Sequence, residues 1–393
     1  MAIADKIKSN ISKSSFIRQM FEKGNALKKK FGPDKVFDFS LGNPNLQPPT
    51  AFSDELIKAA SIRATGIHGY MPNLGYPETR AAVAAQVSIE QDAAVSADDI
   101  VMTCGAAGGL NIIFKTILNP GDEVLVPSPY FVEYGAYASN FDGVLKTVDT
   151  REDFSLDLSA IEAAITPKTK VMLINSPNNP TGQIYPARDL AALGELLGKK
   201  SEEYGHVIFL VSDEPYRKIT YEGKTVPSIF AAYGDSMVVT SYSKDLSIPG
   251  ERIGFVAVCP KAQDRGDLIN GMALANRILG FVNAPALAQR VVAKTQGMEV
   301  DMGEYARKRE LLCNGLNELG YGVTPPPGTF YLFMKAPMED DVEFVQKLQE
   351  ELIIAVPGSA FGKPGYIRLA FCVDDATIEN SLPAFGRVLA ACS

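Results

Sequence analysis

The sequence predicts an α/β fold, in which a mostly parallel sheet is sandwiched by helices and a smaller α+β domain follows. The first indication is a series of short runs that are apolar throughout, which is typical of strands buried on both faces. The second is that amphipathic stretches alternate with these runs from about residue 50 onward. The expected strands span residues 100–103, 123–127, 170–174, 207–211, 237–240 and 253–258.

The connections between these runs fit the same fold. The first run leads into Gly105 and a helix that continues to about Leu118, and Asn-Pro-Gly-Asp at residues 119–122 predicts a turn. The last two runs are too close in sequence for a helical crossover, so one of them is expected to be antiparallel. Polar residues gather directly after the runs. Because open α/β sheets bind ligands at the carboxyl ends of their strands, we expect a site at that edge.

The 393 residues are too many for one compact core, so two or more domains are expected. The pattern changes near residue 294, after which a long charged helix is expected near residues 298–319 and short strands near 330–334 and 366–370. We predict an N-terminal arm and part of the small domain in residues 1–48. A large domain would occupy residues 49–293, and a small C-terminal domain residues 294–393.

The composition narrows the class of protein. A formal net charge of −8 argues against broad nucleic-acid binding, and we interpret the basic run Lys28–Lys30 as a solvated helix face. The five cysteines form no Cys-x-x-Cys pair, which suits reduced thiols in a cytoplasmic protein. With only two histidines, His68 and His206, a metal site or a Ser-His-Asp triad is poorly supported. No apolar stretch reaches the length of a membrane span, and no signal sequence is evident.

Lys244 is the first residue that points to chemistry. It comes directly after an expected strand, in Ser241-Tyr-Ser243-Lys244, and Arg252 follows eight residues later. A lone lysine is more often a surface residue. Here two hydroxyls and a guanidinium accompany it, which indicates a phosphate clamp beside an amine that can condense with an aldehyde.

Asp213 and Tyr216 form a second pair, after the expected strand at 207–211. An aspartate there can pair with a protonated pyridine nitrogen, and a tyrosine three residues later can hydrogen-bond a phenolic oxygen on the same ring. The alternative is an aspartate that caps a helix with a tyrosine packed nearby.

Two further segments follow strands. Asn178-Asn179-Pro-Thr-Gly182 is either a tight turn or a turn that also presents the Asn179 amide to a ligand. Gly105-Ala106-Ala107 begins a helix with small residues, which allow an anion to approach the backbone N–H groups. This is not a Gly-x-Gly-x-x-Gly pattern, so a dinucleotide site is not indicated.

Three motifs occur in the order Asn-Asn-Pro-x-Gly, Asp-Glu-x-Tyr and Ser-x-Ser-Lys, the last with an arginine eight residues later. Together they resemble the motifs of the class I/II aminotransferases, the aspartate aminotransferase-like fold-type I enzymes that use pyridoxal 5'-phosphate. The resemblance extends from about Phe39 to Phe371. It implies ping-pong transfer of an amino group from an L-amino acid to a 2-oxo acid, through an aldimine between Lys244 and the cofactor. It also implies a homodimer with shared active sites. No metal is expected.

The resemblance assigns roles residue by residue. Lys244, Asp213 and Tyr216 match the catalytic residues, and Gly42 and Arg368 match the groups that contact the substrate α-carboxylate. The remaining matches are to the cofactor: Asn179 at the phenolic oxygen, Phe131 stacked on the ring (or Tyr130 in another loop register), Ala106, Ala107, Ser241 and Arg252 at the phosphate, and Tyr70 lent to the phosphate by the second subunit. Ser243 stands where relatives vary.

Three questions stay open. The same scaffold can host a β-lyase or synthase, or a non-enzymatic ligand-sensing regulator. The sequence does not identify the amino donor. Arg277 precedes Gly280-Phe-Val-Asn-Ala-Pro285, which resembles the segment where dicarboxylate-specific relatives bind a side-chain carboxylate with the partner's arginine. We favour the interpretation that Arg277 is a surface arginine at a helix end.

Overall fold

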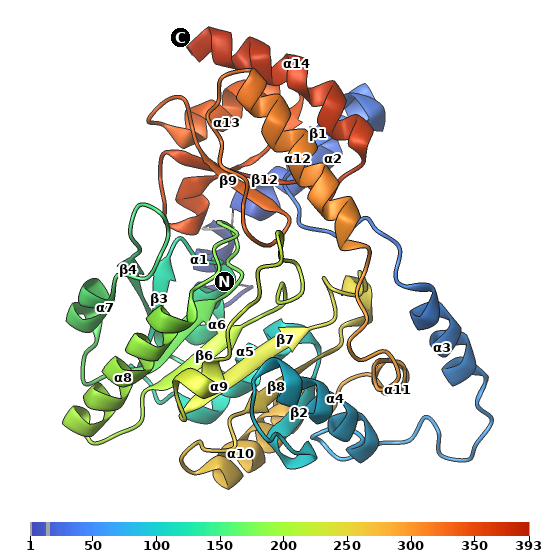
Figure 1. The fold of residues 1–393 in the computed structure, drawn as a ribbon, viewed down its shortest axis with the longest axis vertical. Coiled ribbons are helices and arrows are strands. Elements are labelled where there is room, and N and C mark those ends of the chain that lie inside the picture. Colours follow the sequence, from blue (N-terminus) through green and yellow to red (C-terminus); the bar gives the residue numbers. More distant parts are fainter. Residues whose placement is uncertain (1, 13–15, 393) are drawn as a thin grey trace.

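The computed structural model describes residues 2–12 and 16–392. Its centre is a seven-stranded sheet with the order β2-β8-β7-β6-β5-β3-β4 (Figure 1). All neighbouring strands are parallel except β8, which is antiparallel to both β2 and β7. The strands are β2 (Ile100–Thr103), β3 (Glu123–Ser128), β4 (Val144–Asp149), β5 (Thr169–Asn175), β6 (Phe209–Asp213), β7 (Ser236–Ser241) and β8 (Gly254–Val258).

This sheet confirms the predicted α/β class and the predicted antiparallel strand. The central strands are buried on both faces because helices pack against them. Helix α5 (Gly105–Ile117) packs on β7 and β8, with α10 (Arg265–Ile278) outside it, and α8 (Ala187–Tyr204) packs on β6. Four more helices complete this part of the chain: α4 (Pro77–Glu90), α6 (Glu133–Ser139), α7 (Leu158–Ala164) and α9 (Ile229–Ala232).

A second hydrophobic core joins the beginning of the chain to its end, at the top of Figure 1. It surrounds an antiparallel sheet of β11 (Val356–Pro357), β12 (Tyr366–Ala370) and β9 (Tyr331–Lys335). Next to it, β1 (Phe37–Asp38) pairs in parallel with β10 (Ile353–Ile354). The helices of this region are α2 (Phe16–Phe31), α12 (Met302–Glu318), α13 (Asp341–Glu350) and α14 (Asp375–Cys392). The predicted domain boundaries at residues 48 and 293 stay a prediction, and part of the predicted arm, residues 1 and 13–15, lies outside the described residues.

Three further α-helices complete the described part of the chain, and two of them, α3 (Thr50–Ser61) and α11 (Ala286–Val292), contribute buried side chains to the core around the large sheet. Helix α1 (Asp5–Ser12) lies near the beginning of the chain, and α3 contacts α11. Figure 1 shows α3 and the loop after it extending away from the rest of the chain. No helix in the described part of the chain is both long and apolar enough to cross a membrane. All five cysteines are free thiols, as predicted.

The sheet topology brings the predicted site together. Strands β3, β5, β6 and β7 run in the same direction, so their carboxyl ends meet at one edge. The edge faces the small antiparallel sheet, which carries Arg368 on β12. Residues separated by more than 250 positions in sequence therefore meet in one cavity.

Candidate active site

A cavity of about 280 Å³ lies between the carboxyl edge of the large sheet and the small sheet. Every site residue predicted from the sequence lines it except Tyr70, whose side chain is 93% exposed. The predicted residues that it brings together are Gly42, Ala106, Ala107, Phe131, Asn179, Asp213, Tyr216, Ser241, Lys244, Arg252 and Arg368. Ser243 also lines the cavity, whereas Arg277 is exposed on α10 and does not.

Asp213 ends β6, and its backbone and side chain are both fixed. Its carbonyl oxygen accepts a hydrogen bond from the Asn175 side-chain amide at 2.7 Å, and its carboxylate Oδ2 accepts one from the Tyr134 hydroxyl at 2.7 Å. The other oxygen, Oδ1, is buried and has no hydrogen-bond partner among the described residues. Burial raises the pKa of Asp213 to about 7, and the Tyr134 hydrogen bond opposes that rise. The cavity thus contains one buried carboxylate oxygen that lacks a donor.

Tyr134 was not predicted as a site residue. It lies on α6, three positions after Phe131, and the two rings meet edge to face with centroids 5.5 Å apart. Phe131 precedes the first residue of α6, so no helical spacing in the sequence connects the two rings. Tyr134 therefore links the aromatic wall of the cavity to the Asp213 carboxylate.

The Lys244 amine points into the cavity and donates a hydrogen bond to the carbonyl oxygen of Gly42 at 2.7 Å. Burial lowers its pKa to about 8, and the positive charges of Arg368 and Arg252 act in the same direction. Gly42 has no room for a side chain, because a Cβ there would lie 1.8 Å from the Tyr331 hydroxyl. At pH 7 about a tenth of the Lys244 amine is therefore unprotonated and nucleophilic, far more than for an ordinary lysine.

The amino end of α5 lies beside the Arg252 guanidinium. Gly105 has φ of +74°, and a Cβ on it would lie 2.9 Å from Arg252 Nη2. Ala106 and Ala107 follow in the first turn, and Ser241 lines the cavity nearby. Free N–H groups at a helix N-terminus attract anions, and an arginine adds paired donors. The arrangement is suited to a phosphate group.

Arg368 lies on β12 and is almost completely buried. Its Nη1 donates to Asn179 Oδ1 at 3.0 Å, and its Nη2 donates to the carbonyl oxygen of Ser40 at 2.6 Å. The guanidinium stacks 4.3 Å from the centre of the Tyr331 ring. The Tyr331 hydroxyl in turn lies 3.0 Å from that of Tyr216. Sequence reasoning missed Tyr331, which no motif marks.

The charges that line the cavity are unbalanced. Lys244, Arg252 and Arg368 line it, and none of them forms an ion pair with a carboxylate in the described part of the chain. Among the described residues, the only carboxylate that lines it is that of Asp213. An excess of buried or partly buried positive charge is costly unless an anion joins it. The cavity is therefore suited to a ligand, or a pair of ligands, that carries anionic groups at both ends.

Comparison with known proteins agrees with this geometry. Residues 34–385 match the family described as aminotransferase class I and II. The chain is 33% identical to a probable aspartate aminotransferase of Methanocaldococcus jannaschii, over 94% of this chain and 96% of that protein. It is also 33% identical to an aspartate/prephenate aminotransferase of Thermus thermophilus, over 89% and 90%. An aminotransferase crystal structure from Eubacterium rectale superposes with a TM-score of 0.96 at 37% identity, and each chain is fully covered. The chain belongs to the class I and II aminotransferases, a family that uses pyridoxal phosphate, and it is an aminotransferase.

Proposed function

We propose that this aminotransferase moves the amino group of an L-amino acid to a 2-oxo acid in two half-reactions, with Lys244 as its covalent anchor and proton carrier. The observation that carries the proposal is that one cavity contains both the Lys244 amine and Asp213 Oδ1, an oxygen with no hydrogen-bond partner among the described residues. Family membership favours transfer of the amino group over the β-lyase, synthase and ligand-sensor alternatives.

The residues present fit pyridoxal phosphate. Asp213 Oδ1 is a buried acceptor that lacks a donor, as a protonated pyridine nitrogen would require. The glycine at position 105 leaves space between the N-terminus of α5 and Arg252, where a phosphate would be held. Phe131 would pack on the ring, and Tyr216 and Asn179 would reach its phenolic oxygen. When bound, the cofactor supplies an aldehyde for the substrate amine and a protonated ring that accepts electrons from the substrate α-carbon.

The other residues bind the substrate and move a proton. The Arg368 guanidinium would hold the α-carboxylate in a bidentate pair, and Asn179 and Ser40 already fix the orientation of that guanidinium. The Lys244 amine would accept a proton from the α-carbon, because its pKa of about 8 lies close to neutral pH. Asp213 would stay ionised opposite a cationic partner, since that partner favours the charged carboxylate.

The second subunit is the remaining component of the proposal. Exposed large apolar side chains lie on α3, on the loop after it, on α10 and on α11, and they include Ile57, Tyr70 and Ile278. The loop that carries Tyr70 is tied to the Gly280–Asn283 loop by the Asn73 side chain, which donates to the Val282 carbonyl at 2.7 Å. An exposed apolar surface of this kind is typical of a homodimer interface. Tyr70 and Arg277 lie outside the cavity of their own subunit, so either can act only in a partner's site.

We predict that the purified protein carries pyridoxal phosphate on Lys244. Borohydride should fix the cofactor irreversibly, because it reduces a carbon–nitrogen double bond between the amine and the aldehyde. Peptide mass spectrometry should find the label on the peptide that contains Lys244, and Lys244→Ala should lose it. A label on a different lysine in the native protein would overturn the assignment. Lys347, which is partly exposed on α13 and pairs with Glu343, provides the control substitution.

We also predict a pH-dependent stability difference between the cofactor-free protein and its Asp213→Asn variant. The folded pKa of about 7 lies above the ordinary value of 3.8, so the folded state retains a proton that the unfolded state releases. The stability that this proton contributes is complete below about pH 4 and is lost as the pH rises toward 7. By pH 8 the loss should reach at most about 4 kcal/mol.

Asparagine has no such titration, so the free energy of unfolding of the variant should rise relative to the native protein between pH 5 and pH 8. Denaturant unfolding at a series of pH values measures the difference. A difference that stays constant over this range would show that Asp213 is ionised at ordinary pKa and that the buried-carboxylate account is wrong.

A third prediction concerns the partner subunit. Tyr70→Ala and Lys244→Ala should each be inactive or weak alone, but mixed dimers should contain one site with both native residues. About a quarter of all sites should then be restored after random subunit exchange. Activity after mixing measures this, and exchange itself is followed with differently tagged subunits. If exchange is complete and no activity returns, Tyr70 does not serve the partner's site.

A further inference from the structure

Asp213 and Lys244 are each followed by an acidic residue, and those two acids turn away from the active-site cavity. Glu214 and Asp245 line a separate small cavity of about 30 Å³, which also contains Glu90, Arg217 and Lys218. We call these five residues the rear cluster. Pro215 and Ser241 line both cavities, so the two lie back to back around the ends of β6 and β7.

Glu214 and Asp245 are paired with different cations of the rear cluster, and Glu90 lies 3.7 Å from the same arginine as Glu214. Arg217 Nη1 donates to Glu214 Oε2 at 2.7 Å, and Lys218 Nζ lies 3.6 Å from Asp245 Oδ2. Only 1% of the Glu214 side chain and 14% of the Asp245 side chain are exposed. Because Arg217 and Lys218 are consecutive in sequence, one short turn carries both of the side chains that contact Glu214 and Asp245.

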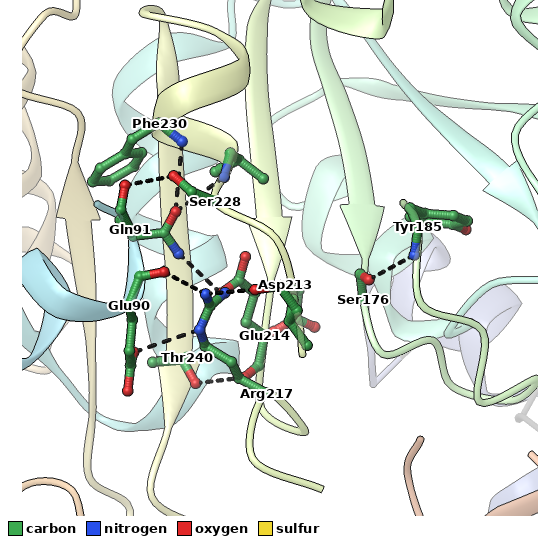
Figure 2. A network of polar contacts seen from close by, with 12 residues as sticks. Glu90, Gln91, Ser176, Tyr185, Asp213, Glu214, Arg217, Ser228, Phe230 and Thr240 are labelled. Atoms are coloured by element: carbon green, nitrogen blue, oxygen red, sulfur yellow. Dashed lines mark hydrogen bonds and ion pairs between the residues drawn. The ribbon is translucent and has the colours of Figure 1, made fainter. Parts of the chain in front are cut away.

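The cations are themselves anchored to distant parts of the chain. Arg217 Nη2 donates to the carbonyl oxygens of Glu90 at 2.5 Å and Val226 at 2.8 Å. Lys218 Nζ donates to the carbonyl oxygen of Met298 at 3.0 Å. Figure 2 shows Arg217 between Glu90 and Glu214, with the Gln91 amide directed at the same Glu214 carboxylate. Neither cation can shift without breaking contacts to more than one segment.

The backbone at the end of β6 is held just as firmly. The Glu214 N–H donates to the Val239 carbonyl at 2.8 Å, and the Thr240 hydroxyl donates to the Glu214 carbonyl at 2.9 Å. With its side chain fixed by Arg217, Glu214 has contacts at its N–H, its carbonyl and its carboxylate. The peptide that joins it to Asp213 therefore has little freedom, and neither does the direction of the Asp213 carboxylate.

We propose that Arg217 and Lys218 are positioning residues for the transamination, which act through Glu214 and Asp245 to fix Asp213 and Lys244. The inference rests on the proposed roles of Asp213 and Lys244. Tyr216 precedes Arg217 directly and lines the active-site cavity. The same turn therefore directs Tyr216 toward the proposed cofactor site and the cations Arg217 and Lys218 toward the rear cluster. Truncation of either cation leaves a buried carboxylate unpaired, and the segment that carries it must then rearrange.

The test compares Arg217→Met and Lys218→Met with the native protein, all loaded with pyridoxal phosphate. Each variant should retain one cofactor per subunit, bound at Lys244. The first half-reaction should slow by about 10- to 100-fold, the scale expected for a small misplacement of reacting groups. The visible circular dichroism of the bound cofactor should change as well, because it reports the orientation of the ring. Arg217→Lys keeps the charge and should recover most of the rate, and Glu214→Gln, which removes the same ion pair, carries the test if Arg217→Met does not fold.

A double variant separates positioning from general damage. Since Glu214→Gln and Arg217→Met remove the same ion pair, the double variant should lose little more rate than Arg217→Met alone. The matched control is Asp99→Asn, which breaks a buried carboxylate–arginine pair with Arg265 before β2, at the opposite edge of the sheet. It should lower the thermal unfolding temperature without altering rate or dichroism.

Two results distinguish this inference from the proposed function. If Asp213→Ala and Lys244→Ala abolish turnover while Arg217→Met and Lys218→Met reduce only stability, as Asp99→Asn does, the positioning inference is wrong and the proposed function stands. If Asp213→Ala leaves turnover intact, the proposed function fails whatever the rear-cluster variants do. A slowed half-reaction with altered dichroism in both Arg217→Met and Lys218→Met supports the inference.

Discussion

The burial of one carboxylate, that of Asp213, is the constraint on which the rest of this structure depends. An ionised carboxylate away from water is costly unless donors or cations surround it, and within the described part of the chain only one of its oxygens has a donor, the Tyr134 hydroxyl. The free protein therefore holds an unsatisfied group at the end of its central strand. Such a group persists in a folded protein when the bound state satisfies it, which is how stability is exchanged for pre-organisation in active sites.

The fold supports this constraint from three directions. Strand β6 is buried between neighbours on both sides, which fixes the position of the Asp213 backbone. Helix α6 supplies Tyr134 and the loop before it supplies Phe131 from one side, and the rear cluster holds Glu214 from the other. The cations that line the cavity then offset the negative charge of incoming phosphate and carboxylate groups. Most of these supports join segments far apart in sequence, as Tyr134 does with Asp213 and Arg217 with the Glu90 carbonyl, so the site exists only in the complete fold.

Much of this could be predicted from the sequence, for physical reasons. Strands β3, β5, β6 and β7 are buried on both faces, so their apolar runs stand out, and the polar residues after them mark the site edge. Strand β4 was missed because it is an edge strand with mostly exposed side chains, and its pattern is that of a loop. Tyr134, Tyr331 and most contacts of the rear cluster were missed because they join remote segments, which no local spacing encodes. The Glu214–Arg217 pair is local, but two charges three residues apart do not by themselves indicate a buried pair. The roles of Tyr70 and Arg277 depend on a second subunit and stay predictions.

The central claim is that Asp213 acts by pairing with the ring nitrogen of the cofactor, and one measurement tests it most directly. The rate of the first half-reaction is measured for the native protein and for Asp213→Ala, each reconstituted with pyridoxal phosphate or with an analogue in which carbon replaces the ring nitrogen. With pyridoxal phosphate the substitution should slow the reaction by about 100-fold or more. With the analogue it should change the rate little, because no nitrogen remains to pair. An equal loss with both cofactors would contradict the account.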